Sequence, residues 1–517
     1  MNTKINAIEQ AQEILQAKCN DDLLNMDVSD GGNADAFAML YGDEFLYVKE
    51  LGWLHWTGKY WRQDNSAILL AMRESFDLRH DRFNRCQDET KASATKRNTY
   101  KLNAAIEQAK ALLAASINDF DRNPDEINVD NGVLNLETLE VTPHDSSQRF
   151  TYCLKVPYDE QADTSVVADF MRTALTKEGE AANTELIDFM QVAMGYGLTG
   201  HTREEKLFYM YGQLGRNGKG TITEALMELM PYPLAQEVDF NTFIARRDGD
   251  SQNFDLADMK SSRMIFASES NKYQMLNPAS IKKLTGGNYV RAAHKFKEFF
   301  TYRPQYKAWL SSNHKVNGDP DDDVMWGRVL VIEFPNSYMG REIKTLKELL
   351  KSPDVQRGLL RWLAIGAQKW YATGLIVPEQ VMLATKKMQG ELDTFSDWFE
   401  EAVKADTGAF LAYADAYQNY SVWCENNGVT AKKRTQFSES MLKRGHEAKQ
   451  KRTGQIVAKG YYSLALTEEY VMVSNSKYSK AFPIASNDTE KSATTPIEPM
   501  PNYYSSLITV DDYEPDE

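Results

Sequence analysis

Apolar and polar residues follow a strand-like pattern soon after the N-terminus. A helical period occupies residues 5–18, and a polar turn follows it. Residues 35–61 are aromatic and strand-like, with Trp53, Trp56 and Trp61 spaced among short apolar runs. Large aromatic side chains of this kind mostly fill protein cores. The pattern therefore predicts a small twisted sheet with the tryptophans in its core.

Helical and strand-like segments then alternate along the N-terminal part of the chain. Residues 65–117 are highly charged and mainly helical in pattern. Residues 126–156 are strand-like again, and Asn131-Gly132 between apolar runs predicts a β-hairpin. Amphipathic helices are predicted next, at residues 166–176 and 184–195. We therefore expect a mixed α and β region that ends in helices.

Apolar strand-like runs and helical periods alternate in the middle of the chain. The runs occupy residues 207–211, 263–269, 308–313 and 329–334. A helical stretch at residues 343–373 closes this part. The alternation predicts an α/β fold for the region.

The C-terminal part changes from helical patterns to a polar tail. A two-stranded hairpin is predicted to follow helices at residues 395–403, 412–426 and 435–444, which is the order of a winged helix. Residues 475–517 are rich in Ser, Pro, Asn and acidic residues. Such a composition predicts a disordered tail.

The composition excludes several classes of protein. Of the 517 residues, 42% are hydrophobic and 26% are charged, which are ordinary globular values. The sequence shows neither an apolar run of about 18 residues, as a membrane span needs, nor a secretory signal. The four cysteines lie far apart and form neither a disulfide framework nor a zinc pattern. We therefore expect several domains in a reducing cytoplasm, with no membrane partner.

The net charge of −15 limits how this chain could bind nucleic acid. Proteins that coat nucleic acid are usually basic. Contacts with DNA must therefore be concentrated in local basic segments.

A glycine-rich turn between an apolar run and a helical period is the strongest chemical signal. It reads Gly212-Gln-Leu-Gly-Arg-Asn-Gly-Lys-Gly-Thr221. In such a turn, backbone N–H groups converge on phosphate oxygens and a lysine reaches the terminal phosphates. The predicted nucleotide-binding residues are Gly212, Gly215, Asn217, Gly218, Lys219, Gly220 and Thr221.

The turn departs from the general phosphate-loop pattern in two places. Gln213 stands where the pattern has its first glycine, and Gly220 stands where it has Ser or Thr. An ordinary glycine-rich loop is therefore the alternative interpretation.

Polar residues at the ends of the later apolar runs could complete a catalytic site. Glu269 ends the second run, where a carboxylate could polarise water or hold Mg²⁺. Asn313 ends the third run and could position water against a γ-phosphate. Arg328 directly precedes the fourth run. For Glu269, a surface carboxylate after a buried strand is the alternative.

These motifs resemble those of superfamily-3 helicases of the AAA+ type, in the branch of poxvirus primase–helicases and phage or plasmid replication proteins. The resemblance is carried by Asn217-Gly-Lys-Gly-Thr221, Phe266-Ala-Ser-Glu269, Ile281-Lys-Lys-Leu-Thr-Gly-Gly-Asn288, Arg291-Ala-Ala-His-Lys-Phe-Lys297, Ser311-Ser-Asn-His314 and Trp326-Gly-Arg328. A weaker similarity covers most of residues 35–467.

The resemblance implies an ATP-driven homohexameric ring that translocates on DNA. It implies that Lys219 binds phosphate, that Thr221 and Glu269 help to hold Mg²⁺, and that Glu269 is the acid/base residue. Asn313 would sense the γ-phosphate, and Arg328 would be the arginine finger that reaches into a neighbouring subunit.

The sequence departs from its relatives near two of these residues. Ser268 precedes Glu269, where some relatives have a second acid, and Gly327 stands where many have a second arginine. Arg263 and Arg303 therefore remain alternative finger residues.

The implied fold class is α/β, with an AAA+ P-loop ATPase core, an N-terminal α+β region, a helical collar and a C-terminal winged helix. The expected domains are an N-terminal α+β helicase-associated domain (1–157), a helical collar for oligomerisation (158–203), the ATPase domain with its closing helices (204–375), a winged-helix-like DNA-binding domain (376–470) and an acidic tail (471–517).

Two basic segments are predicted to contact DNA. Residues 291–298 carry His294, Lys295 and Lys297, and this region resembles the family's hairpin that faces the ring channel; a solvated charged strand is the alternative. The second segment, residues 432–459, has nine Lys and Arg against two Glu, and a peripheral soluble face is its alternative. Its predicted DNA-binding residues are Lys432, Lys433, Arg434, Lys443 and Arg444.

The predicted function is therefore an ATP-dependent replicative DNA helicase of a phage, plasmid or other mobile element, in a bacterial cytoplasm. An origin-binding initiator or scaffold that binds ATP without unwinding DNA is the alternative. A phosphotransferase acting on a small molecule is disfavoured, because it has no use for Asn313, Arg328 or a basic hairpin. Intrinsic priming is not expected, because Asp119-Phe-Asp121 is interpreted as a loop carboxylate pair. A replication protein could bind the acidic end, residues 507–517.

Overall fold

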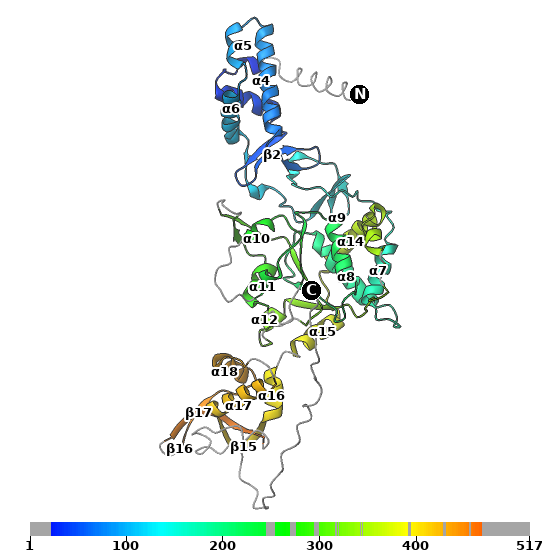
Figure 1. The fold of residues 1–517 in the computed structure, drawn as a ribbon, viewed down its shortest axis with the longest axis vertical. Coiled ribbons are helices and arrows are strands. Elements are labelled where there is room, and N and C mark those ends of the chain that lie inside the picture. The colour runs from blue at the N-terminus through cyan, green and yellow to red at the C-terminus, as the bar shows by residue number, and fades with distance from the viewer. Residues whose placement is uncertain are drawn as a thin grey trace, which may run out of the picture. The chain divides into compact units, whose positions relative to one another are not determined.

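The computed structural model has two compact units, Met1–Leu392 and Asp393–Glu517 (Figure 1). It describes residues 22–244, 254–268, 276–293, 299–315, 318, 320–341, 343, 345–390, 394–427, 431–453 and 456–467. Within these ranges no helix is long and apolar enough to cross a membrane. The predicted helix at residues 5–18, the acidic tail, Glu269, His294, Lys295 and Lys297 lie outside the described residues.

The first unit begins with helices packed on a small sheet. The helices are α2 (Asp22–Asn25), α3 (Asp30–Tyr41), α4 (Ala67–Arg85), α5 (Glu89–Thr95) and α6 (Thr99–Leu112). The sheet order is β3-β2-β1-β4, from β1 (Phe45–Val48), β2 (Gly52–Trp56), β3 (Trp61–Gln63) and β4 (Ala114–Ala115). The predicted helices in residues 65–117 are confirmed. Trp53 and Trp61 are buried as predicted, and Trp56 is half-buried.

The prediction of strand at residues 35–41 is wrong, because these residues belong to α3. Ser29 caps this helix by accepting a hydrogen bond from the Gly32 N–H. Phe37 and Tyr41, one turn apart, stack with ring centroids separated by 5.3 Å. The aromatic residues therefore follow a helical period here, before the strands begin.

A second small sheet follows the first. It contains β5 (Glu126–Val129), β6 (Gly132–Asn135) and β7 (Val141–Thr142). The predicted hairpin is confirmed, but Val129 pairs with Gly132, so the turn residues are Asp130 and Asn131. The run at residues 150–154 is not a regular strand, although the Leu154 N–H donates to the Asn128 carbonyl.

Asp121 is a buried carboxylate with structural partners. It follows the short 3₁₀ helix η1 (Ile117–Asp119). It accepts hydrogen bonds from the Thr151 N–H and hydroxyl and from the Ser261 hydroxyl. This carboxylate therefore ties three distant segments together.

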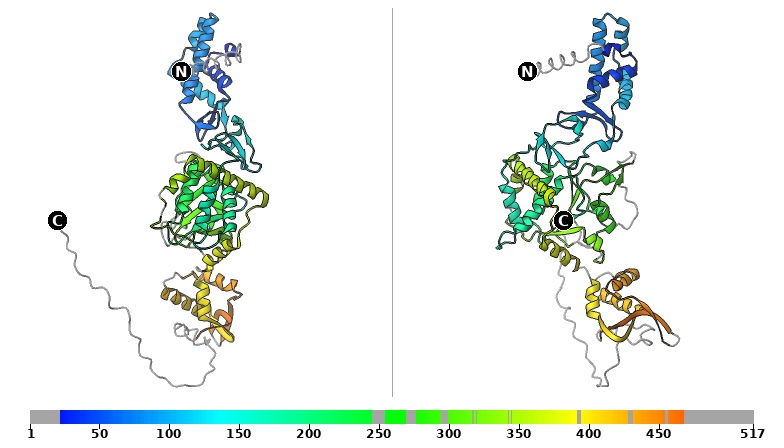
Figure 2. Two further views of the ribbon diagram at one scale, coloured as in Figure 1. Left: turned by 90° about the vertical axis from the view of Figure 1, so that its right-hand side faces the viewer. Right: turned by 180° about the vertical axis from the view of Figure 1, so that it is seen from behind.

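Long helices cover one face of the central sheet (Figure 2). They are α7 (Ser165–Leu175), α8 (Thr184–Leu198) and α14 (Pro353–Thr373), which confirms the predicted helices. Helices α8 and α14 approach closely at Gly195, where a Cβ atom would lie 2.2 Å from the Ala367 nitrogen. A larger residue at Gly195 would force these helices apart.

The central sheet contains parallel strands in the order β14-β8-β13-β10-β9. They are β8 (Leu207–Tyr211), β9 (Ala235–Glu237), β10 (Met264–Ser268), β13 (Lys307–Ser312) and β14 (Val329–Glu333). All four predicted apolar runs are strands of this sheet. Alternate residues point to opposite faces, so Phe208 packs with α8 and α14, whereas Tyr209 lies in the core of the other face. A parallel sheet buried on both faces is typical of α/β proteins.

The remaining elements of the first unit surround this sheet. They are α9 (Lys219–Leu229), η3 (Phe240–Thr242), α10 (Phe254–Asp258), α11 (Pro278–Thr285), α12 (Asp323–Trp326), α13 (Leu346–Leu350) and α15 (Glu379–Gly390). Strands β11 (Val290–Ala292) and β12 (Phe300–Tyr302) pair antiparallel, and residues 293–299 connect them in sequence. Helix α15 contacts β14, where the Val331 N–H donates to the Thr385 hydroxyl. Helix α15 therefore belongs to the first unit.

The second unit packs three helices against an antiparallel sheet. The elements are α16 (Thr394–Ala402), β15 (Val403–Ala412), α17 (Tyr413–Asn426), α18 (Arg434–Lys443), β16 (Lys449–Thr453) and β17 (Ile456–Leu466). The sheet order is β15-β17-β16. The three predicted helices and the hairpin are confirmed, whereas β15 was not predicted. After the buried Val403, residues 404–408 of β15 are half-buried or exposed, and residues 409–412 are all buried, so the strand shows no regular alternation.

Candidate nucleotide-binding site

The glycine-rich turn has the backbone geometry that a phosphate loop requires. Gly215 and Gly218 have positive φ angles of 66° and 91°, a region that favours glycine. At Gly212, a Cβ atom would lie 1.8 Å from the Asn217 side-chain nitrogen. Helix α9 begins at Lys219, directly after Gly218. The turn therefore places backbone N–H groups and a helix N-terminus around one point.

Lys219 is buried beneath this turn with only neutral partners. Its side chain is 4% exposed. The ammonium donates to the Asn217 and Asn313 side-chain oxygens, each at 2.9 Å, and to the Gly212 carbonyl at 3.3 Å. Burial lowers the pKa of this lysine to about 8. Within the described ranges, no carboxylate pairs with it.

The residues present fit a triphosphate. The buried ammonium has no counter-charge among the described residues, so an anion would stabilise it. The side-chain nitrogen of Asn217 is also buried and has no hydrogen-bond acceptor in the described part of the chain. A phosphate oxygen would satisfy both groups at once.

Asn313 lies next to the glycine-rich turn because β8 and β13 are adjacent. Ser312 pairs with Tyr211, so Asn313 and Gly212 each follow directly after paired strand ends. Ser268 pairs with Ser311, which puts the end of β10 at the same edge. The structure therefore brings Lys219 and Asn313 together, and Glu269 follows β10 outside the described residues.

Two residues that brace the turn were not predicted from the sequence. The Tyr338 N–H donates to the Arg216 carbonyl at 2.9 Å, and the Ser337 hydroxyl donates to the Gly215 carbonyl at 3.1 Å. Both follow β14, which lies beside β8 in the sheet. No sequence motif marks them, because strand order decides their proximity.

The described residues contain no group of three or more His, Cys, Asp or Glu side chains that could hold a metal. Magnesium in nucleotide sites takes most of its ligands from phosphate and water. Thr221, in the first turn of α9 and partly exposed, could supply a hydroxyl ligand to such an ion.

Arg328 lies at the amino ends of the parallel strands, whereas the glycine-rich turn and Lys219 lie at their carboxyl ends. It precedes Val329, which pairs with Leu207 at the amino end of β8. A strand of this length spans roughly 16 Å. The Arg328 guanidinium bonds to the Glu205 carboxylate at 2.7 Å and to the Thr285 hydroxyl at 3.1 Å. Arg328 is therefore separated from the phosphate loop of its own chain by the length of the sheet.

The structure excludes Arg263 as an alternative finger. Arg263 is 1% exposed and donates to the Asn123 carbonyl at 2.7 Å. A side chain enclosed in this way cannot reach another subunit. Arg303 is exposed and stays an alternative.

The basic residues predicted in the second unit surround α18. Lys433, Arg434 and Lys443 are exposed. Lys432 and Arg444 are half-buried, and their cations lie 5.8 Å and 4.6 Å from the Phe395 ring centroid. These two residues therefore also stabilise the core of the unit.

The chain is similar in sequence to two protein families and to two viral proteins. Residues 34–176 match the family described as D5 N terminal like, and residues 210–328 match the family of unknown function DUF5906. A protein of Acanthamoeba polyphaga mimivirus named as a helicase, L207/L206, is 27% identical over 388 residues, which cover 69% of this chain and 39% of the relative. A second protein named as a helicase, 022R of Frog virus 3 (isolate Goorha), is 24% identical over 244 residues, 43% of this chain and 25% of the relative.

The resemblance to superfamily-3 helicases of the primase–helicase type is confirmed.

The matches to the two viral proteins are partial in length. The chain spans less than half of the length of the two viral proteins. Among solved structures, the apo A form of the NrS-1 C-terminal region aligns with 83% of this chain and 99% of its own, at 10% identity and a TM-score of 0.45.

Proposed function

We propose that this chain is an ATP-dependent replicative DNA helicase of superfamily 3. One observation carries the proposal: a buried lysine and a strand-end asparagine, 2.9 Å apart, lie beneath a glycine-rich turn at the edge of a parallel sheet. Lys219 and the turn would bind the phosphates of ATP, and Asn313 would sense the γ-phosphate. The helicase names of the two viral relatives support DNA as the partner.

We further propose a homohexameric ring with ATP sites between subunits. Within one chain, Arg328 lies at the sheet edge opposite Lys219. Two copies placed side by side would bring Arg328 of one chain to the phosphate loop of the next. The strand order, with β8 between β14 and β13, supports an AAA+ core for this ring.

Hydrolysis in this proposal needs Mg²⁺ and an acid. The metal would neutralise charge on the phosphates, with Thr221 as one ligand. Glu269 would polarise the attacking water or help to hold the metal. In the transition state, the buried ammonium of Lys219 and the guanidinium of Arg328 would stabilise the negative charge that develops on the phosphate oxygens.

Two parts of the chain would contact DNA. The β11–β12 hairpin carries His294, Lys295 and Lys297 between its arms, and it would face the ring channel. The second unit has helices α16 to α18 followed by the β16–β17 hairpin, which supports a winged-helix assignment with α18 as the DNA-reading helix.

The domain division is part of the same proposal. Residues 1–157 would assist the ATPase, residues 158–203 would form the collar and residues 204–375 would form the ATPase domain. Of the predicted DNA-binding region 376–470, the part after α15 would bind DNA. Because α15 packs on β14, its residues would move with the ATPase domain. The tail, residues 471–517, would recruit a replication protein of a phage, plasmid or other mobile element.

DNA-stimulated ATP hydrolysis with displacement of a strand from forked DNA tests the function. An origin-binding initiator that binds ATP would bind duplex DNA through the second unit but would displace no strand. Mass measurement with ATP and forked DNA tests the ring. A protein that stays monomeric under these conditions would contradict the shared ATP site.

The affinity for ATP should fall as the pH rises above about 8. Burial lowers the pKa of Lys219 to about 8, and bound phosphates would raise it again. The ammonium is therefore charged before binding below pH 8, whereas above it each pH unit should weaken binding by up to about tenfold. Titration with a non-hydrolysable ATP analogue between pH 6.5 and 9.5 measures this. Lys219→Arg, if it binds, should remove this dependence because arginine stays protonated.

Replacing Lys295 and Lys297 by alanine should uncouple DNA from hydrolysis. Each phosphate contact to a single strand contributes about −0.7 to the slope of log affinity against log salt, so the slope should flatten by roughly 1.4. ATP hydrolysis without DNA should persist, whereas its stimulation by DNA and strand displacement should fall sharply. Lys386→Ala/Lys387→Ala on α15 is the control, because both residues are exposed. Normal unwinding by the hairpin variant would exclude the hairpin as the translocating element.

A further inference from the structure

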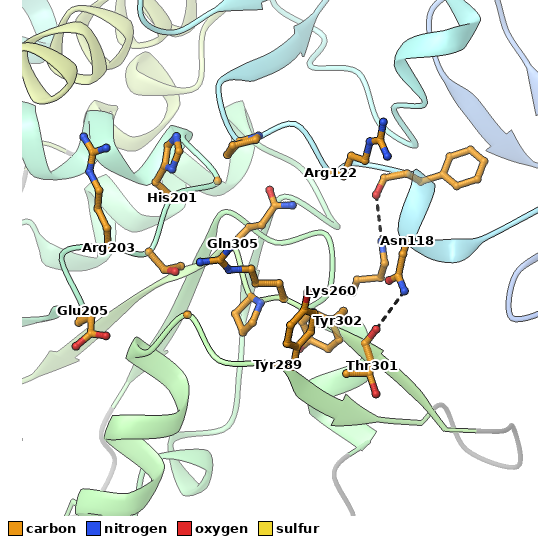
Figure 3. Close-up of a pocket in the computed structure, with 17 residues that line it drawn as sticks. Asn118, Arg122, His201, Arg203, Glu205, Lys260, Tyr289, Thr301, Tyr302 and Gln305 are labelled. Atoms are coloured by element: carbon orange, nitrogen blue, oxygen red, sulfur yellow. Dashed lines mark hydrogen bonds between the residues drawn. The ribbon is translucent and has the colours of Figure 1, made fainter.

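A basic pocket lies at the sheet edge opposite the phosphate loop (Figure 3). Its volume is about 540 Å³. One wall, formed by residues 200–203 and Glu205, lies just before β8, and Gln305 lies two residues before β13. The other walls come from η1 and the loop after it, from Lys260 after α10, and from the start and end of the β11–β12 hairpin. The pocket is therefore separate from the nucleotide site of the same chain.

The lining is cationic in a chain that is acidic as a whole. Four of the lining side chains are cations, namely Arg122, Arg203, Lys260 and Arg303. Among the described residues that line the pocket, the only carboxylate is that of Glu205, and it already pairs with Arg328 at 2.7 Å. Asp119 and Asp121 lie near Lys260, but the lining itself has an excess of positive charge in a chain whose net charge is −15, and this excess favours an anionic ligand.

Two of the arginines that line the pocket are available to bind a ligand. Within the described part of the chain, neither Arg122 nor Arg303 forms an ion pair or a hydrogen bond, and both are exposed. Arg203 lies over the Trp370 ring at 4.1 Å, and Lys260 donates to the Phe120 carbonyl at 3.2 Å. Figure 3 shows Arg203 on one side of the pocket and Arg122 and Lys260 on the other. The free donors suit an extended anion with more than one phosphate.

An aromatic side chain stands at the same pocket. Tyr289, just before β11, lines it and is 76% exposed. Exposed aromatic rings beside cationic side chains are characteristic of sites for single-stranded nucleic acid, where bases stack on the rings. The pocket also lies at the base of the hairpin whose tip is proposed to hold DNA.

We propose that this pocket binds single-stranded DNA, with Arg122 and Arg303 at backbone phosphates and Tyr289 stacked on a base. The proposal rests on the proposed helicase function, since it extends the path of the DNA strand from residues 294–297 to the start and end of the β11–β12 hairpin. It assigns the N-terminal region a direct DNA contact through Arg122.

The test uses the full-length chain and a fluorescein-labelled oligothymidylate. Arg122→Glu/Tyr289→Ala should weaken binding by about tenfold or more, given what one stacked base contributes. The salt slope between about 50 and 200 mM should flatten by about 0.7 or more. Arg85→Glu/Tyr100→Ala is the matched control, because both residues are exposed on helices away from the pocket lining. Tyr289→Phe keeps the ring and should bind like the wild type.

The readouts separate this proposal from its rivals. Unchanged affinity and salt slope in Arg122→Glu/Tyr289→Ala, with an unchanged melting temperature, would overturn it. Normal DNA affinity with impaired ATP hydrolysis would overturn it too, because the pocket would then serve the nucleotide of a neighbouring subunit. A wild-type chain that binds oligothymidylate but does not hydrolyse ATP would contradict the proposed helicase and leave the pocket standing.

Discussion

Exchanging Arg328 for alanine should lower the rate of ATP hydrolysis by about 10³–10⁵ while nucleotide binding persists. The reason is the position of Arg328, at the sheet edge opposite Lys219, from which it would act on the ATP of a neighbouring subunit. The fold should survive, because Glu205 is 48% exposed and stays hydrated when its partner Arg328, which is 20% exposed, is removed. Steady-state hydrolysis and a fluorescent ATP analogue measure the two effects.

Mixing two inactive variants tests whether the site is shared. Glu269→Gln removes the acid but keeps the finger, whereas Arg328→Ala keeps the acid. Rings that contain both should have some interfaces with an intact acid and an intact finger, so part of the activity should return. No recovery, together with monomers by mass, would contradict a shared site. Arg263→Ala is a useful contrast, because loss of this buried guanidinium should lower the melting temperature instead.

Exchanging Lys219 for alanine should reduce ATP hydrolysis by at least about 10²-fold, as loss of a preorganised charge at the phosphates does. The ammonium lies at 2.9 Å from both Asn217 and Asn313, so alanine would also leave these side chains without a donor. Removing a buried charge that has no carboxylate partner among the described residues should leave the fold stable. Binding of an ATP analogue, hydrolysis and thermal melting are the measurements.

Lys91→Ala is a matched control for this exchange, because Lys91 is exposed on α5 and far from the turn in sequence. It should hydrolyse ATP at the wild-type rate. If Lys219→Ala also does so, the glycine-rich turn does not bind the nucleotide and the ordinary-loop alternative is correct.

Local sequence determined most of the elements and the loop chemistry. Strands β8, β10, β13 and β14 were predictable because a strand that is buried on both faces needs a continuous run of apolar residues, and each run is visible in the sequence. The glycines of the turn predicted its conformation, since Gly215 and Gly218 have positive φ angles that other residues rarely adopt. The helices α7, α8, α16, α17 and α18 followed from amphipathic periods in the same way.

The errors arose where local patterns are ambiguous. Residues 35–41 were predicted as strand but form part of helix α3, because a short cluster of aromatic residues is compatible with both the helical and the strand period. Strand β15 has a polar first half, and it forms because β17 lies beside it. No residue pattern within residues 403–412 could have shown that pairing.

Only the tertiary structure decided which predicted residues meet. Lys219 and Asn313 are 94 positions apart, and they lie together because β8 and β13 are neighbours in one sheet. Arg263 and Arg328 each precede a strand, so the sequence does not distinguish them. In the structure, Arg263 is buried, whereas Arg328 lies at the amino end of β14 beside Glu205. The basic pocket is likewise built from five separate segments of the chain. Sequence specifies the chemistry of each segment, whereas strand order, set by packing of the whole core, specifies their distances.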